Sequence, residues 1–187
     1  MYMGRRPLDS QVGRCRCRPE VKGYAMVADI RLEARYRRTD MQDPVLLSTS
    51  GDVDRLVDAL LTGPALHDAA HILSRARSRV SAEFPDHGLY VGVSRNANAG
   101  ALALTAPEVG HVASAGNPGS GSGVAYHVAG HWTEFPDDSE IPIVLVREAL
   151  KEFLHSGGSV PDCIEWKPFE IADEGVEDDP WGSTTGR

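Results

Sequence analysis

Hydrophobic and polar residues alternate strictly from Ile30 to Arg37, which predicts a β-strand with one buried and one solvated face. The apolar face holds Ile30, Leu32, Ala34 and Tyr36, and the polar face holds Arg31, Glu33, Arg35 and Arg37. Pro44 then leads into Val45–Leu47, a short apolar run that we interpret as the second strand of a hairpin.

A helical repeat follows this hairpin. The apolar residues fall at i, i+3, i+4 and i+7, which predicts one stripe packed on a sheet; they are Val53, Leu56, Val57 and Leu60. We expect Ser50 to cap the helix, and Asp52 and Asp54 lie in the first turn, where the helix dipole favours anions. The pair Gly63-Pro64 is typical of a helix end.

Short strands with turn residues between them occupy the middle of the chain. The predicted strands are residues 69–76 (a weak pattern), 89–93, 100–105, 109–115 and 124–128. Their spacing of about ten residues predicts an antiparallel meander. The Gly/Ser-rich residues 117–123 have no Lys-Ser/Thr for a phosphate loop, so we interpret them as a hairpin loop between strands.

The stretch Gly130–Trp166 carries the second helix. A loop rich in His, Trp and acidic residues is expected at 131–138, before Pro142 in the first helical turn. The buried stripe of the helix is Ile143, Val146, Leu150, Phe153 and Leu154. Gly157-Gly158 ends the helix, and a final strand should bury Cys163 as a small core residue beside Ile164 and Trp166.

These elements predict an α+β fold, an antiparallel sheet of about six to eight strands with two main helices packed on one face. We expect one domain over residues 26–168. Residues 1–25 lack periodicity and are interpreted as a disordered or mis-called N-terminal extension, with Met26 as the natural start. Residues 169–187 are predicted to be an acidic disordered tail.

The charge is unevenly distributed along the chain. The net charge is −8, but residues 1–40 hold ten Arg/Lys against five Asp/Glu, whereas residues 41–187 hold nine against twenty-two. The acidic residues 41–187 therefore do not provide the positively charged surface that binds nucleic acid. Their charge favours a basic protein partner, because opposite potentials speed encounter; acidity for solubility alone is the simpler alternative.

Nothing in the sequence predicts a membrane segment, because no apolar run approaches the roughly 18–20 residues that a membrane helix needs. An apolar segment typical of a secretory signal does not follow Arg5 and Arg6. The three cysteines have no zinc-site spacing and fit a reducing compartment. We therefore expect a cytoplasmic protein without a cofactor.

The sequence contains residues suited to two kinds of catalytic site. His127, His131 and Glu134 could hold a metal in a small hydrolase, but on one strand the two histidines would lie about 13 Å apart at 3.3 Å per residue unless the chain bends at Gly130. Acid–base chemistry could use carboxylates of Glu134, Asp137, Asp138 and Glu165, although acidic pairs near a proline turn are more often solvated. No catalytic residue and no metal ligand is predicted.

The tryptophans are more informative, because Trp132 lies in a polar stretch where exposure is costly and aromatic anchors dominate protein–protein interfaces. The alternative is that each Trp fills a junction between sheet and helix. For Trp166 we favour the core, and for Trp132 both interpretations stay open.

Residues 130–166 closely resemble the signature of the first-numbered immunity protein family of bacterial polymorphic toxin systems. Its members look like G-H-x-T-E-F-P-x-x-S-x-I/V-P, then A-L/V-x-E-F-L-x-S/T-G, then P-x-x-I/V-x-W. The matching residues are Gly130, His131, Thr133, Glu134, Phe135, Pro136, Ser139, Ile141, Pro142, Ala149, Leu150, Glu152, Phe153, Leu154, Ser156, Gly157, Pro161, Ile164 and Trp166. Residues 51–64 and 85–93 are similar to the family's first helix and middle strand, so the likeness spans about residues 26–168.

The resemblance implies a small non-enzymatic protein that binds a toxin encoded by a neighbouring gene and blocks its active site. Such toxins often belong to the deaminase superfamily. We expect partner contacts from His131, Trp132, Glu134, Asp137 and Asp138. A structural role is expected for Phe135, Pro136, Pro142, Phe153, Gly157 and Trp166. The chain departs from the family in its Ala-rich residues 101–115 and its loop 117–123, which fits either partner tuning or an orphan domain.

Overall fold

The computed structural model describes residues 30–77, 85–116 and 124–169. The predictions for residues 1–25, for the loop 117–123 and for the acidic tail after Phe169 therefore lie outside the described residues. No helix in the described ranges is long and apolar enough to span a membrane.

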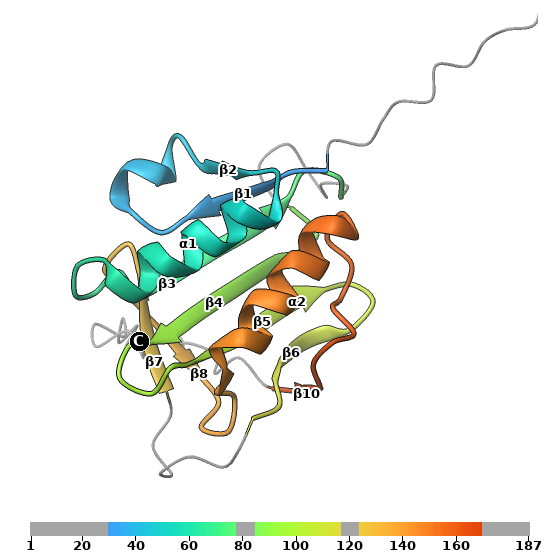
Figure 1. Ribbon diagram of the computed structural model, residues 1–187. Helices are drawn as coiled ribbons and strands as arrows, with labels where there is room; N and C mark the ends of the chain where they lie inside the picture. The colour runs from blue at the N-terminus through green and yellow to red at the C-terminus, as the bar shows by residue number, and fades with distance from the viewer. Residues whose placement is uncertain (1–29, 78–84, 117–123, 170–187) are drawn as a thin grey trace, which may run out of the picture.

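An antiparallel eight-stranded sheet carries both helices on one face and a two-stranded ribbon on the other, as Figure 1 shows. The sheet runs in the order β10-β6-β5-β4-β3-β1-β2, with β9 paired to β5, and the ribbon is β7-β8. The elements in chain order are β1 (Leu32–Arg35), a short 3-10 helix (Arg38–Met41), β2 (Val45–Leu47), α1 (Ser50–Thr62), β3 (Ala69–Ser74), β4 (Gly88–Ser94), β5 (Ala99–Ala106), β6 (Gly110–Ser114), β7 (Val124–Val128), β8 (His131–Phe135), β9 (Ile141–Pro142), α2 (Ile143–His155) and β10 (Trp166–Pro168). The predicted fold class is confirmed.

The main core lies between the helices and the sheet, because the apolar stripes of both helices face the larger side chains of the central strands. It includes Leu56, Val57, Val91, Leu102, Leu104, Val146, Leu150 and Phe153. A second, smaller core lies between the ribbon and the opposite face, where the sheet presents alanines; it includes Ala69, Ala101, Ala103, Tyr126, Val128 and Phe135. Both predicted helical stripes are confirmed as buried.

The first hairpin forms as predicted, with β1 antiparallel to β2, but two details were wrong. Ile30 is 48% exposed and precedes β1. Glu33, expected in water, is only 6% exposed, because the guanidinium groups of Arg35 and Arg75 lie 3.1 and 3.5 Å from its carboxylate. A charged side chain on the outer face of this strand is thus paired instead of solvated.

The N-cap of α1 is Thr49 rather than Ser50, which already belongs to the helix. The Thr49 hydroxyl accepts a hydrogen bond from the Asp52 N–H, and the Asp52 carboxylate accepts one from the Thr49 N–H at 2.8 Å. This reciprocal capping box satisfies two backbone donors, so the prediction missed the cap by one residue.

Three predictions for the second half of the chain were wrong. Residues 131–135 form strand β8 instead of a loop. The strands on either side of residues 117–123 are not hairpin partners, because β6 pairs with β5 and β10 whereas β7 pairs with β8 in the separate ribbon. The last strand spans only Trp166–Pro168, so Cys163 lies before it and is exposed instead of buried.

Candidate binding site

The ribbon β7-β8 contains most of the residues that the sequence analysis singled out. Ala129 and Gly130 form its two-residue turn, with φ of 52° and 87°, the left-handed values of a type I′ turn. The chain therefore reverses at Gly130, and His127 pairs with Trp132 while Val128 pairs with His131. The two histidines lie on different strands, because the chain bends at Gly130, the alternative that the sequence left open.

The inner face of the ribbon is held by aromatic packing on small residues. The rings of Tyr126 and Phe135 meet edge to face at 5.4 Å, and both side chains are buried. Gly92 on β4 makes room for them, because a Cβ there would lie 2.1 Å from the Tyr126 ring. The ribbon can approach the sheet this closely only because the strands beneath it carry Gly and Ala.

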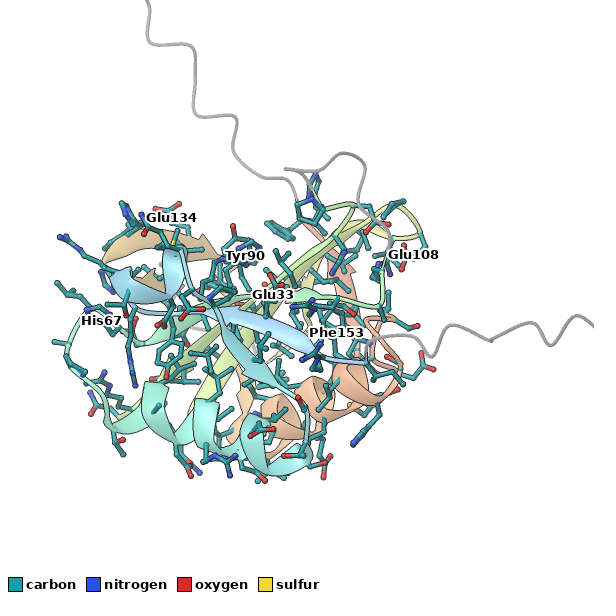
Figure 2. The ribbon with its side chains drawn as sticks, turned by 90° about the horizontal axis from the view of Figure 1, so that it is seen from above. Glu33, His67, Tyr90, Glu108, Glu134 and Phe153 are labelled. Carbon is teal, nitrogen blue, oxygen red and sulfur yellow. The ribbon has the colours of Figure 1, made fainter. Side chains whose placement is uncertain are left out.

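The outer face of the ribbon presents Trp132, which is 64% exposed. Its indole Nε1 donates a hydrogen bond to the Glu134 carboxylate at 3.1 Å, and its ring meets the His127 ring edge to face at 5.6 Å. Figure 2 places Glu134 on the side of the sheet away from the helices. His131 and Glu134 are exposed as well, so three neighbouring side chains of β8 face solvent.

The turn after β8 has a structural role. The buried Ser139 hydroxyl donates to the Pro136 carbonyl at 2.6 Å, and the Ser139 carbonyl accepts from the Ser114 hydroxyl at 2.5 Å. The Tyr126 hydroxyl donates to the Glu140 carboxylate at 2.6 Å, and burial together with this carboxylate raises the Tyr126 pKa. These bonds attach the ribbon to β6 and to the start of α2.

Asp137 and Asp138, which were expected to contact a partner, lie in this turn and are half-buried. The Asp138 carboxylate pairs with the Lys167 ammonium on β10, and its carbonyl accepts from the Gly116 N–H at 2.7 Å. Burial lowers the Lys167 pKa, and Asp137 opposes that shift. The structure thus separates the two aspartates from the fully exposed part of β8.

The motif residues after α2 also support the fold. The Glu152 carboxylate accepts from the backbone N–H groups of Asp162 and Cys163 at 2.9 and 3.1 Å, which lowers the Glu152 pKa. The indole of Trp166 donates to the Pro161 carbonyl at 2.7 Å and packs against the main core. Gly157 has φ of 72°, a conformation suited to glycine at a helix end.

The residues singled out in the sequence, the family-like motif together with Trp132 at one of its variable positions, therefore divide into two groups. Buried or hydrogen-bonded members shape the turn, α2 and the C-terminal segment. His131, Trp132 and Glu134 remain exposed on β8, and among the described residues the side-chain contacts of Trp132 stay within the ribbon. A surface aromatic flanked by polar groups on a rigid strand pair is an arrangement suited to binding another protein.

The hydrolase hypothesis finds no metal site in the described ranges, which contain no group of three or more His, Cys, Asp or Glu side chains placed to hold an ion. His127 is instead engaged by Asp68, whose carboxylate oxygen lies 3.4 Å from its Nδ1 and accepts from its backbone N–H at 2.6 Å.

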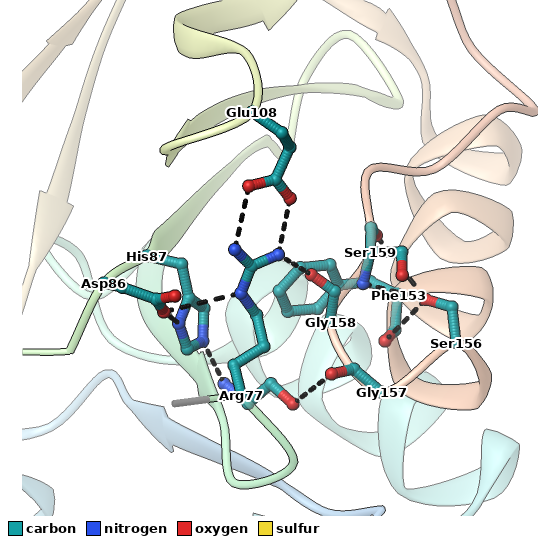
Figure 3. Close-up of polar contacts among 10 residues, drawn as sticks. Arg77, Asp86, His87, Glu108, Phe153, Ser156, Gly157, Gly158 and Ser159 are labelled. Atoms are coloured by element: carbon teal, nitrogen blue, oxygen red, sulfur yellow. Dashed lines mark hydrogen bonds and ion pairs between the residues drawn. The ribbon is translucent and has the colours of Figure 1, made fainter. Parts of the chain in front are cut away.

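A polar network around the buried His87, which the sequence did not predict, joins the ends of β3, β4 and α2 (Figure 3). His87 accepts a hydrogen bond from the Ser74 N–H at Nε2 (2.7 Å), so its Nδ1 carries the proton directed at Asp86, also at 2.7 Å. Burial lowers the His87 pKa. An Asp–His pair can activate a nucleophile, but here both ring nitrogens are already engaged inside the fold.

Arg77 completes this network. Its guanidinium binds the Glu108 carboxylate through two nitrogens at 2.5 and 2.9 Å and donates to the Gly158 carbonyl at 3.0 Å. The bidentate bond lowers the Glu108 pKa to about 2. The turn residues before β4 were the sequence signal for this cluster, but only the fold brings Arg77 and Glu108 together across 31 positions.

Comparison with known proteins gives one family. The family model described as immunity protein Imm1 matches residues 41–168, which include both helices and every strand except β1. No curated protein matches the chain. The matched segment contains the ribbon, the turn after it and the C-terminal motif, and it covers more than half of the chain.

Proposed function

We propose, from the premise that this chain belongs to the Imm1 family of immunity proteins, that it binds a cognate toxin encoded by a neighbouring gene and blocks the toxin's active site. The single observation that supports this most is the exposed Trp132 on β8. Its indole adds contact area at little entropic cost, because the ribbon and the bond to Glu134 already restrain it.

The proposed mechanism is steric occlusion by the outer face of the ribbon, which presents Trp132 and Glu134, together with its turn end, where His131 is exposed. Trp132 would enter the toxin's cleft, and His131 and Glu134 would contact its rim. Asp137 and Asp138 would add negative charge from the turn after β8, although the Asp138 carboxylate is already paired with Lys167 on β10. Inhibition by occlusion needs no reaction in this chain, so we propose a non-enzymatic protein without a cofactor.

The acidic charge favours a toxin that acts on nucleic acid. The net charge of −8 complements the basic cleft that such an enzyme needs to hold phosphates. A deaminase-type toxin of a polymorphic toxin system fits this description, and neutralisation would then take place in the cytoplasm. Direct binding of nucleic acid by this chain is disfavoured for the same electrostatic reason.

Co-expression with the toxin from the neighbouring gene tests the proposal. We expect cells producing the toxin to survive only when this chain is produced too, and the two proteins to elute together in gel filtration. The proposed function would be refuted if the cells died although this chain was produced in soluble form, and if no complex of the two proteins was recovered. A Phe153→Asp variant is the control, because a charge in the main core should unfold the chain and abolish rescue.

A further inference from the structure

The two edges of the ribbon β7-β8 are not equivalent. Residues that flank a two-residue turn exchange both of their backbone hydrogen bonds, so Val128 and His131 bond each other. The next pair, His127 and Trp132, must then point its N–H and C=O groups outward. Two residues further on, Glu134 on β8 and its partner Ala125 on β7 also point their backbone N–H and C=O groups outward.

One outward group of β7, the N–H of His127, meets a side chain of the same molecule. The His127 N–H donates to the Asp68 carboxylate at 2.6 Å. Asp68 is itself fixed, because its carbonyl accepts from the Val93 N–H at 2.9 Å. A carboxylate at this position occupies a donor that an incoming strand would use, so the β7 edge is blocked at His127.

The outward groups of β8 have no such cover. Within the part of the chain that the structure describes, the backbone groups of Trp132 and Glu134 make no hydrogen bond outside the ribbon. Five consecutive residue pairs run without a bulge, and the strand contains neither Lys nor Pro, the usual devices that protect an edge. The donors and acceptors of β8 are therefore arranged to receive another strand.

We infer that an extended segment of the toxin adds to β8 as the third strand of the ribbon, an inference that rests on the proposed function. Main-chain hydrogen bonds to Trp132 and Glu134 would hold the segment, as in other cases of strand addition. The side chains of Trp132 and Glu134 determine which toxin segment fits. It should carry an apolar residue that covers the exposed indole and an Arg or Lys that lies beside Glu134. The net charge of −8 favours such a basic partner over a second copy of this chain, which would bring two acidic bodies together.

Proline substitution at the two edges separates this binding mode from simple side-chain contact. Glu134→Pro removes an outward N–H and leaves the bonds within the ribbon intact, and Ala125→Pro makes the same change on β7, directly opposite. Glu134→Gln keeps the backbone and removes only the charge. The probe is the purified toxin domain from the neighbouring gene, titrated against each full-length variant, with thermal unfolding to confirm that each is folded.

We expect Glu134→Pro to weaken toxin binding at least 100-fold, Glu134→Gln less than tenfold and Ala125→Pro less than threefold. Amide hydrogen exchange at Trp132 and Glu134 should slow on complex formation. Equal binding by wild type and Glu134→Pro, without slowed exchange, would overturn strand addition and leave the proposed function standing. No binding by wild type would refute the proposed function itself. A dimer of this chain that Glu134→Pro dissociates would make a second copy the occupant and overturn the inference.

Discussion

Trp132 is the residue with the most exposed large apolar side chain among those that the structure describes. Its position is constrained on three sides, by the strand, by Glu134 and by the ring of His127. The fold gains little from an indole in this position, because most of its surface stays in water. A residue of this kind is expected to matter for binding and not for stability.

Trp132→Ala should therefore weaken toxin binding by about 2 kcal/mol or more, roughly 30-fold, as truncation of a central aromatic anchor does. The free energy of unfolding should change by less than about 0.5 kcal/mol, since the side chain is on the surface. Calorimetric titration and urea unfolding measure the two quantities. Val144→Ala is the control, because Val144 is 59% exposed on the helix face, and its affinity should stay at the wild-type value. An unchanged affinity of Trp132→Ala would contradict the assignment.

The burial of His71 leads to a prediction about how the stability of the fold depends on pH. Its imidazole stacks on Tyr90 at 4.4 Å, and burial, with Arg35 and His87 nearby, lowers its pKa from 6.5 to about 4. A histidine with a depressed pKa in the folded state stabilises the fold above its unfolded pKa, and this contribution is lost as pH falls from 6.5 towards 4. Between pH 7 and pH 5 the loss is about 2 kcal/mol.

A His71→Gln variant should thus lose about 2 kcal/mol less than wild type over this pH interval, because Gln does not titrate. Urea unfolding at pH 7 and pH 5 measures the difference. The loss measured for wild type over the same interval is the reference for the variant. Parallel losses in wild type and His71→Gln would show that other groups cause the acid sensitivity.

At the scale of elements, the ribbon owes its position to small residues. Gly92→Ala would place a methyl group against the Tyr126 ring, and either the ring or the ribbon must move. We expect a destabilisation of about 1–3 kcal/mol, as overpacking produces, together with weaker toxin binding. Gly51→Ala on the exposed side of α1 should instead be neutral or stabilise by up to about 1 kcal/mol, because its nearest neighbour would lie at 3.6 Å. Thermal unfolding compares the two; equal effects would show that the close approach is unimportant.

The helices were predictable from sequence because each depends on a local repeat and on local end signals. Val53 to Leu60 and Ile143 to Leu154 bury the residues that the repeat selects. β8 was not predictable in this way, since polar residues stand at His131, Thr133 and Glu134 and leave no apolar alternation along the strand. Periodicity cannot separate a polar strand from a loop, so the pairing itself was needed.

The structural roles of the motif residues were also not predictable from local sequence patterns. The resemblance in residues 130–166 indicated the family, but not which motif residues are structural. Asp138 binds Lys167 across the sheet edge, and Glu152 receives two N–H groups from the segment after the helix. These partners are distant in sequence, so no local pattern predicts the contacts. Only the fold separated Trp132 and Glu134 from such structural positions.

At the scale of the whole molecule, charge should govern how quickly the complex forms. An acidic chain and a basic toxin attract one another at long range, and salt screens this attraction within about 10 Å at 0.1 M. The association rate constant should fall at least tenfold between about 20 mM and 500 mM salt, while the dissociation rate changes much less. Stopped-flow mixing measures both, and a salt-independent association rate would argue against electrostatic steering.

The two faces of the sheet carry different parts of the molecule, one for stability and one for the proposed binding. The helices cover one face of the sheet and build the main core, whereas the ribbon covers the other and carries the exposed residues (Figure 1). Substitutions on the exposed helix face should accordingly leave toxin binding intact. Those on β8 should reduce binding without unfolding the chain.

Inhibition of the toxin by the purified chain tests the central claim most directly. The catalytic activity of the toxin domain from the neighbouring gene would be measured against increasing amounts of wild-type chain and of Trp132→Ala. We predict complete inhibition by wild type at one chain per toxin, with loss of substrate binding by the toxin, and a strongly right-shifted curve for the variant. Full toxin activity in the presence of excess wild-type chain would contradict the account.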